Sequence, residues 1–169
     1  MPTAFPVVIL DQEHVLYECK AAQETRAQIE SQRLAFQTEI DKHEKELRQE
    51  EEILKQLEAS LSEKEFLKRR NAFDHRVADI HKKVALRRSQ LERAFNKARE
   101  EIMNKINEIV ARLSNEKKYA LVMQKGAVIY SRKPLDITQD VLRELDNLLP
   151  TVIVESGNEI RTMTEENLK

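Results

Sequence analysis

The chain has 169 residues, a net charge of −1, 35% charged residues, two glycines and no tryptophan. This length suggests one domain, and the shortage of helix breakers beside many charged residues predicts long helices. The single cysteine, Cys19, excludes an intrachain disulfide, and a buried, inert thiol is expected because it follows an apolar stretch. The sequence has no run of about 18 apolar residues, which excludes a membrane-spanning helix.

Residues 1–19 are expected to form one strand and one short helix. The apolar run at residues 7–10 is typical of a strand buried on both faces, and a brief helix is expected near residues 13–19. Met1 is followed by neither the charged nor the apolar segment of a signal peptide. The protein is therefore either cytosolic, or its signal peptide has been removed and Met1 is not native.

Residues 20–118 are predicted to form two long helices that fold back on each other as a coiled-coil-like hairpin arm. Apolar residues recur every seven positions in the first helix, which is the period of a coiled-coil seam. Polar side chains interrupt this seam, so we expect it to be loose, partly hydrated and easily opened. The heptad residues are Ile40, Leu47, Leu54 and Leu61 in one position and Val15, Ala22, Ile29, Phe36 and Leu57 in the other; the interrupting residues are Arg26, Arg33, His43 and Glu50.

The tip of the hairpin is expected near residues 59–62. Ser62 and Glu65 have the spacing of a capping box, in which each side chain satisfies an unpaired amide at a helix start. One continuous helix over residues 20–118, about 150 Å long at 1.5 Å per residue, is the alternative. In the hairpin the two arms differ in length, so a kink, a bulge or a tilted docking is expected to absorb the difference.

Positive charge is concentrated in the second helix of the predicted hairpin. Residues 20–60 carry 7 Lys/Arg and 10 Asp/Glu, whereas residues 64–99 carry 12 and 4, a net charge of +8. A long cationic face attracts anionic partners in a salt-dependent way. A solvated surface, and for the phenylalanines closure of the seam, is the alternative reading. The candidate residues for contact with a bound polypeptide or an anion are Lys68, Arg69, Arg70, Arg76, Lys82, Lys83, Arg87, Arg88, Phe66 and Phe73.

Residues 119–150 are predicted to supply further strands and a final helix. Two strand-like runs, at 120–123 and 127–130, flank the permissive turn residue Gly126. With the first strand they are expected to build a small β hub that mediates oligomerisation. The predicted hub residues are Val7, Val8, Ile9, Leu10, Leu121, Val122, Val128, Ile129 and Tyr130.

The final helix is predicted after Asp136 and Thr138, which offer helix caps, and it ends at Pro150. Residues 151–169 are expected to form a disordered tail, with an edge strand at 151–154 as the alternative. The fold class is therefore α+β and mostly α, with a long helical-hairpin arm attached to a small β hub.

No constellation of catalytic or metal-binding residues stands out in the sequence. The four histidines lack the H-E-x-x-H spacing, no paired cysteines exist, and two glycines 31 residues apart exclude a phosphate-binding loop. Aromatic residues are too sparse among the basic ones for nucleic-acid binding to be expected. We therefore predict a protein that is not an enzyme and that uses no cofactor or metal.

The order of these elements resembles the Skp/OmpH family of periplasmic chaperones. The likeness covers residues 6–149, and its most specific part is the C-terminal block: a strand, a turn, an apolar run ending in Tyr130, and then Asp136-Ile137-Thr138 before an apolar pair. The resemblance implies a homotrimer of jellyfish shape, in which strands of three chains build the hub and three hairpins surround a cavity. It also implies a periplasmic, ATP-independent holdase for unfolded outer-membrane proteins. The imperfect seam separately predicts that the arms open to adapt the cavity to client size.

One feature departs from the family. Well-known members are strongly basic, whereas this sequence has a pI of about 6.5, so attraction to anionic lipid or lipopolysaccharide is expected only locally, on the second helix. No short motif carries a lipopolysaccharide site over residue by residue. A cytosolic prefoldin-like holdase and a structural coiled-coil spacer with one fixed partner are the alternative functions.

Overall fold

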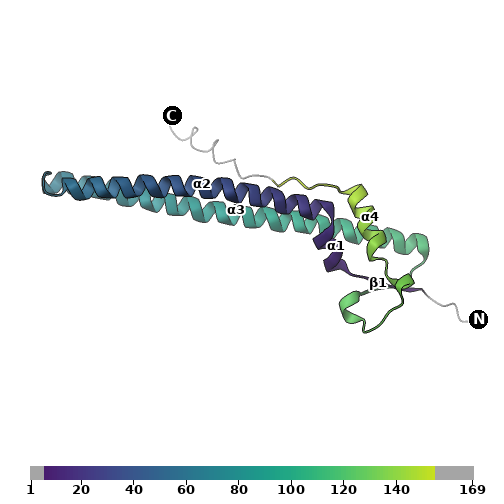
Figure 1. Ribbon diagram of the computed structural model, residues 1–169. Helices are drawn as coiled ribbons and strands as arrows, with labels where there is room; N and C mark the ends of the chain where they lie inside the picture. Colours follow the sequence, from purple (N-terminus) through teal and green to yellow (C-terminus); the bar gives the residue numbers. More distant parts are fainter. Residues whose placement is uncertain (1–5, 155–169) are drawn as a thin grey trace, which may run out of the picture. The chain divides into compact units, whose positions relative to one another are not determined.

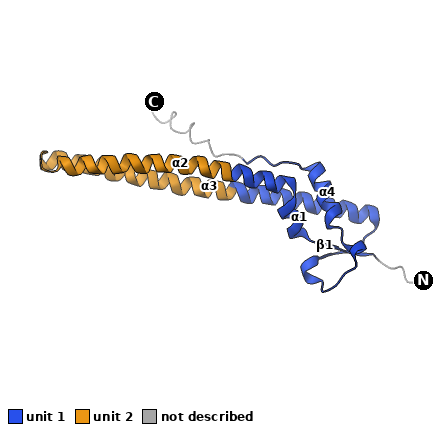
Figure 2. Ribbon diagram, viewed as in Figure 1, with its two compact units in different colours: residues 1–29, 94–155 blue, residues 30–93, 156–169 orange. Residues whose placement is uncertain are grey.

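The structure is a computed structural model that describes residues 6–154. The chain divides into two compact units (Figure 2). Within the described residues, the first unit consists of residues 6–29 and 94–154, and the second of residues 30–93. Both long helices contribute residues to each unit.

The described residues are mostly helical, with one short pair of strands (Figure 1), which confirms the predicted fold class; assembly as a trimer stays a prediction. The strand at residues 7–10, the short helix after it, the two long helices and the final helix all form close to their predicted places. The elements are β1 (Val7–Leu10), α1 (Gln12–Glu18), α2 (Lys20–Leu57), α3 (Glu63–Lys117), β2 (Leu121–Gln124), the short 3-10 turns η1 (Lys125–Ala127) and η2 (Lys133–Leu135), and α4 (Thr138–Leu148).

In the second unit, α2 and α3 are joined by a tight turn at residues 58–62. The hairpin prediction is thus confirmed, and the alternative of one continuous helix is wrong. Ser62 Oγ accepts a hydrogen bond from the amide of Glu65 (3.4 Å) and donates one to Glu65 Oε2 (2.7 Å), as expected of a capping box. These bonds hold the pKa of Glu65 below its usual value.

The core of the first unit lies where α1 and α4 pack against the C-terminal half of α3. Apolar residues of α3 recur there at spacings of four and three, which places them on one helix face. Burying one such side chain stabilises the fold by roughly 1.5–3 kcal/mol. The largest fully buried side chains are Val15, Cys19, Ile102, Ile106, Ile109, Val141 and Leu145.

A break at Cys19 separates α1 from α2. The backbone of Cys19 is extended, with φ −63° and ψ 149°. Gln12 Nε2 of α1 donates to Asn107 Oδ1 of α3 (3.2 Å), so α1 continues the packing on α3 ahead of α2. The break therefore takes up the difference in length between α2, with 38 residues, and α3, with 55. The Cys19 thiol is buried, as predicted, and burial raises its pKa.

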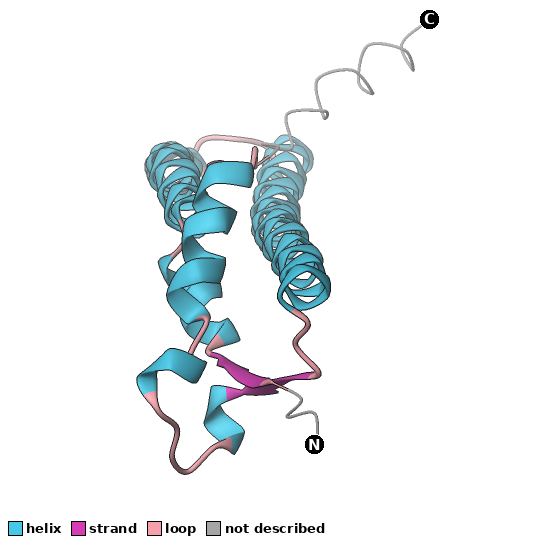
Figure 3. Ribbon diagram, turned by 90° about the vertical axis from the view of Figure 1, so that its right-hand side faces the viewer, coloured by secondary structure: helices cyan, strands magenta, loops and turns pink. Residues whose placement is uncertain are grey.

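The two strands pair in parallel, with Val7 opposite Leu121 and Leu10 opposite Gln124 (Figure 3). On its other side β1 meets the segment before α4, because the amide of Ile137 donates to the carbonyl of Ile9 (2.9 Å). Thr138 Oγ1 accepts from the amide of Asp11 (2.9 Å), so this threonine ties α4 to α1 and does not cap its own helix. β1 is therefore enclosed on both edges, whereas β2 pairs on one edge only within the described residues.

The predicted strand at residues 127–130 is wrong. Residues 125–127 form the turn η1, and Val128 is extended but pairs with no strand of the described chain. Ile129 and Tyr130 are almost fully exposed. A strand needs a neighbour for its backbone groups, and the described part of this chain places none there.

The segment after α4 also differs from expectation. Residues 151–154 form neither helix nor strand, yet Val152 and Val154 are buried. This part of the predicted tail is packed against the first unit, so its assignment as disordered is wrong. The remainder of that prediction, for residues 155–169, lies outside the described residues.

Candidate functional site

The cationic face of the second unit lies on α3. Arg69, Arg76 and Lys83 are spaced by seven residues, which brings them to one side of the helix. Among residues 6–154, no ion pair within 4 Å is found for six of the predicted contact residues, and most of these side chains are exposed. These six are Lys68, Arg69, Lys82, Lys83, Arg87 and Arg88.

Two of the predicted contact residues already have acidic partners. Arg76 reaches across to α2, with its Nη1 3.0 Å from Glu50 Oε2 and its Nη2 3.3 Å from Glu46 Oε2. Arg70 pairs with Asp74 one turn along α3, at 3.3 Å. Exposed ion pairs of this kind contribute only about 0–1 kcal/mol each, so the two pairs of Arg76 hold α2 and α3 together weakly. Glu50 is one of the residues predicted to interrupt the seam, and the structure shows that it does so as half of an ion pair.

The apolar residues exposed on the second unit are not the phenylalanines singled out from the sequence. Phe66 and Phe73 are half-buried, which agrees with the alternative that they close the seam. Four aliphatic side chains lie more than 40% exposed instead, and sequence reasoning missed them because it followed the aromatic residues. Their positions outside the heptad frame were the feature of the sequence that could have identified them as exposed. They are Leu34, Ile53, Leu67 and Leu86.

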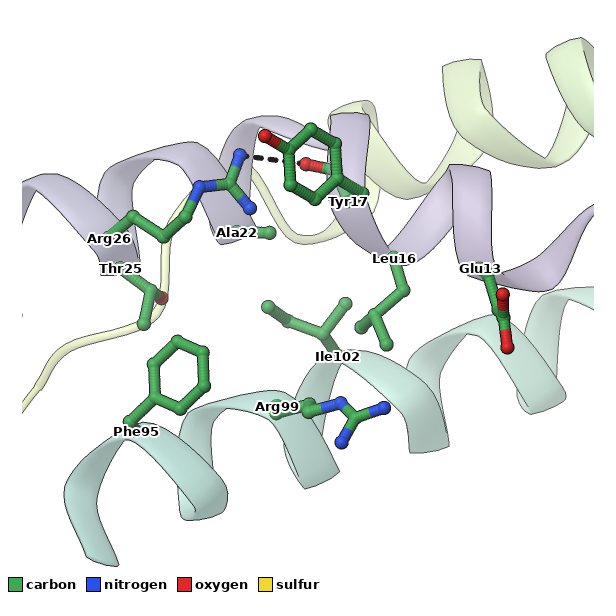
Figure 4. Close-up of a pocket in the computed structure, with 9 residues that line it drawn as sticks. All are labelled: Glu13, Leu16, Tyr17, Ala22, Thr25, Arg26, Phe95, Arg99 and Ile102. Carbon is green, nitrogen blue, oxygen red and sulfur yellow. Dashed lines mark hydrogen bonds between the residues drawn. The ribbon is translucent and has the colours of Figure 1, made fainter. Parts of the chain in front are cut away.

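A pocket of about 260 Å³ opens in the first unit between α1, the start of α2 and α3 (Figure 4). Its floor is apolar, with Leu16, Ala22 and Ile102 facing one another. The guanidinium of Arg26 lies 4.4 Å from the ring centre of Tyr17 and donates to the Tyr17 carbonyl (2.8 Å). The remaining lining residues are Glu13, Thr25, Phe95 and Arg99.

Thr25 is the unusual member of this pocket. Its side chain is 2% exposed, and no hydrogen-bond partner of its Oγ1 is found among the described residues. A buried hydroxyl without a partner costs free energy. The pocket therefore combines an apolar floor with two arginines, one glutamate and one buried hydroxyl that has spare hydrogen-bonding capacity.

The predicted hub residues differ in burial. Val8 and Leu10 are buried in the chain's own core. Ile9 is also buried, but it lines an open apolar hollow together with Val7, Val128, Ile129 and Tyr130. Val122 and Val128 are half-buried, and the exposed members are Val7, Leu121, Ile129 and Tyr130.

The best-organised charged cluster has a structural role. Lys125 Nζ lies 3.6 Å from Asp11 Oδ2 and 3.3 Å from Asp136 Oδ2, and Asp136 accepts from the amide of Thr138 (3.0 Å). Partial burial opposes ionisation of Asp136, but its bonds to Thr138 and Lys125 outweigh this and lower its pKa. Among residues 6–154, no group of three or more His, Cys, Asp or Glu side chains is placed to hold a metal ion. Over the same residues, no helix is both long and apolar enough to span a bilayer.

Comparisons with known proteins agree on one family. The family described as "Outer membrane protein (OmpH-like)" matches residues 6–145. A search of curated proteins finds no match to the chain. Among solved structures the chain is similar to an OmpH-like outer membrane chaperone from Caulobacter crescentus CB15, with a TM-score of 0.83, 16% identity and 92% of each chain covered. At this identity the structural likeness shows the fold, and the family match carries the assignment. The chain belongs to the OmpH-like family of outer membrane proteins.

Proposed function

We propose that this protein is an ATP-independent holdase that binds unfolded outer-membrane proteins in the periplasm and keeps them from aggregating. The observation that carries the proposal is the surface of the second unit, where unpaired cationic residues of α3 lie among exposed aliphatic side chains. Such a surface offers many weak contacts to an unfolded chain and no single tight site. The family to which the chain belongs supports a chaperone role.

The proposed assembly is a homotrimer. Val7, Ile129 and Tyr130 line an open apolar hollow beside β1 and β2, and Leu121 of β2 is also exposed; exposed apolar patches mark association surfaces. The extended residues around Val128 are then expected to pair with a strand of another copy. Three hairpins would enclose a cavity for the client.

The weak contact between α2 and α3 in the second unit suits the proposed binding of unfolded clients. Exposed ion pairs from Arg76 replace apolar contacts at Glu46 and Glu50, so separating the helices there costs little free energy. We propose that the arms open to fit clients of different sizes. Anionic lipid or lipopolysaccharide is proposed as a further partner of the same cationic face. Nucleic acid, cofactors and catalysis have no part in the proposal.

The prefoldin-like alternative fits the chain less well. In prefoldins the strands lie between the two long helices, whereas here β1 precedes the helices and β2 follows them. The spacer alternative calls for a continuous helix, which the turn at residues 58–62 contradicts.

An aggregation assay tests the proposed function. An unfolded outer-membrane β-barrel protein is diluted out of denaturant with and without the chaperone, and light scattering is followed. We expect the wild type to suppress scattering and the variant Lys82→Glu/Lys83→Glu to suppress it less. The matched control reverses two exposed lysines of α2 in the same unit, Lys42→Glu/Lys45→Glu. No suppression by the wild type would refute the proposal, and equal losses in the two variants would refute the role of the α3 face.

A further inference from the structure

Residues 151–154, which follow Pro150 after the end of α4, lie in the first unit with side chains that are alternately exposed and buried. Val152 is 4% exposed, Ile153 82% and Val154 6%. Side chains that point alternately inward and outward are characteristic of an extended strand. Val152 joins the apolar cluster built by α1, α2, α3 and α4. The segment at residues 151–154 thus lies as an extended strand would, beside a helix instead of a sheet (Figure 1).

Gln28 of α2 binds the backbone of this segment at two points. Its Nε2 donates to the carbonyl of Val152 (3.1 Å), and its Oε1 accepts from the amide of Val154 (3.0 Å). In a parallel β ladder, one residue donates to the residue before its partner and accepts from the residue after it. With Ile153 as the partner, the carboxamide of Gln28 makes this same pair of bonds.

This arrangement recognises the backbone rather than particular side chains. The two hydrogen bonds are available to any extended segment without proline at the second bonded position. Two buried side-chain sites, now filled by Val152 and Val154, select for apolar residues at every second position. We call Gln28 and these two side-chain sites the Gln28 groove. Strand-addition sites work in the same way, since main-chain bonds give affinity and alternate pockets give specificity.

We propose that the Gln28 groove is a binding site for extended polypeptide segments with apolar residues at alternate positions, and that residues 151–154 occupy it as a tethered competitor. The inference rests on the proposed chaperone function and names the client segment involved. Strands of transmembrane barrels have this alternation, with one face apolar and the other polar. A client strand then displaces the chain's own segment and takes over its two bonds to Gln28.

The covalent attachment of residues 151–154 to the chain determines how large a change in peptide affinity is expected. A segment joined to its site by a few residues has an effective concentration on the order of millimolar. A free peptide of the same sequence must compete against that concentration, so its binding to the wild type is weak. Releasing the tethered segment should strengthen peptide binding about tenfold or more.

The experiment measures binding of a fluorescein-labelled peptide copying residues 149–156 to the full chain by fluorescence anisotropy. Val152→Asp/Val154→Asp releases the segment by placing charges in the two apolar sites. The matched control is Ile153→Asp, which adds the same charge one position away, where the side chain is exposed. A second way to release the segment is Val154→Pro, which removes the amide that Gln28 accepts from and adds no charge.

We expect both released variants to bind the peptide about tenfold more tightly than the wild type and Ile153→Asp do. Adding Gln28→Ala to either released variant should remove the gain. Unchanged affinity in both released variants, or an equal gain in Ile153→Asp, would overturn the inference.

The aggregation assay, run on the same variants, separates this inference from the proposed function. Suppression of scattering by every variant, with no peptide bound by the released ones, would refute the groove and leave the holdase proposal standing. Peptide binding that depends on release and on Gln28, without suppression of scattering by any variant, would refute the holdase proposal and support the groove.

Discussion

The same substitution at two isoleucines should cost very different amounts of stability. Ile106 of α3 is completely buried in the core of the first unit, whereas Ile40 of α2 is half-buried on the interrupted seam of the second. Ile→Ala removes about three methylene equivalents, each worth about 0.8 kcal/mol when buried. At Ile106 a cavity adds to this loss, so we expect a cost of about 3–4 kcal/mol. At Ile40 about half of the area is lost and the open seam leaves no closed cavity, so we expect about 1 kcal/mol.

Urea unfolding at one fixed protein concentration measures the two costs, because association also contributes to apparent stability. Hydrogen exchange followed by mass spectrometry adds a local readout. Ile40→Ala should speed exchange within residues 30–93 and leave residues 94–154 nearly unchanged. Equal costs for the two substitutions, or wild-type amides of residues 30–93 as strongly protected as those of α4, would refute the idea that the seam is loose.

Three further outcomes are expected. Thr25→Val should raise the free energy of unfolding by about 1 kcal/mol, since it replaces a buried hydroxyl that lacks a partner with a methyl group. Thr25→Ser, which keeps the hydroxyl, is the control, and destabilisation by Thr25→Val would show that the hydroxyl is hydrogen-bonded. The pKa of Asp136 is lowered in the folded chain, so its carboxylate stabilises the fold above its ordinary pKa of 3.8, and this stabilisation is lost as pH falls through the lower folded pKa. Asp136→Asn should flatten this loss of stability in acid-unfolding curves, and unchanged curves would contradict the prediction. Ile129→Asp/Tyr130→Ser should shift sedimentation from the proposed oligomer to the monomer, whereas sedimentation like that of the wild type would remove these residues from the proposed interface.

Local signals in the sequence were sufficient for most of the helical elements. The heptad spacing, the capping box at Ser62 and Pro150 act within a few residues, so they predicted the two long helices, the turn between them and the end of α4. The run at residues 127–130 has equally good local features. It failed as a strand because a strand also requires a neighbour, and the described chain supplies none beside it.

The candidate site was predicted less completely than the fold. Counting charges identified the cationic helix, but it gave no sign that Arg76 is paired across the hairpin with Glu46 and Glu50. Burial of Val152 and Val154 depends on Gln28, which lies more than 120 residues earlier in the chain. Periodicity within one segment cannot reveal a contact at that separation. The pocket around Thr25 likewise depends on three helices meeting, which no single motif encodes.

The parallel register of β1 and β2 has a consequence for the order of folding. Val7 is synthesised early, whereas its partner Leu121 lies 114 positions later in the chain. Closing so long a loop is entropically costly unless the intervening chain has already become compact. Helix formation between the strands is local and fast, and it must therefore precede their pairing. The apolar hollow beside the two strands is therefore completed last, and the association surface proposed above forms only after the rest of the chain has folded.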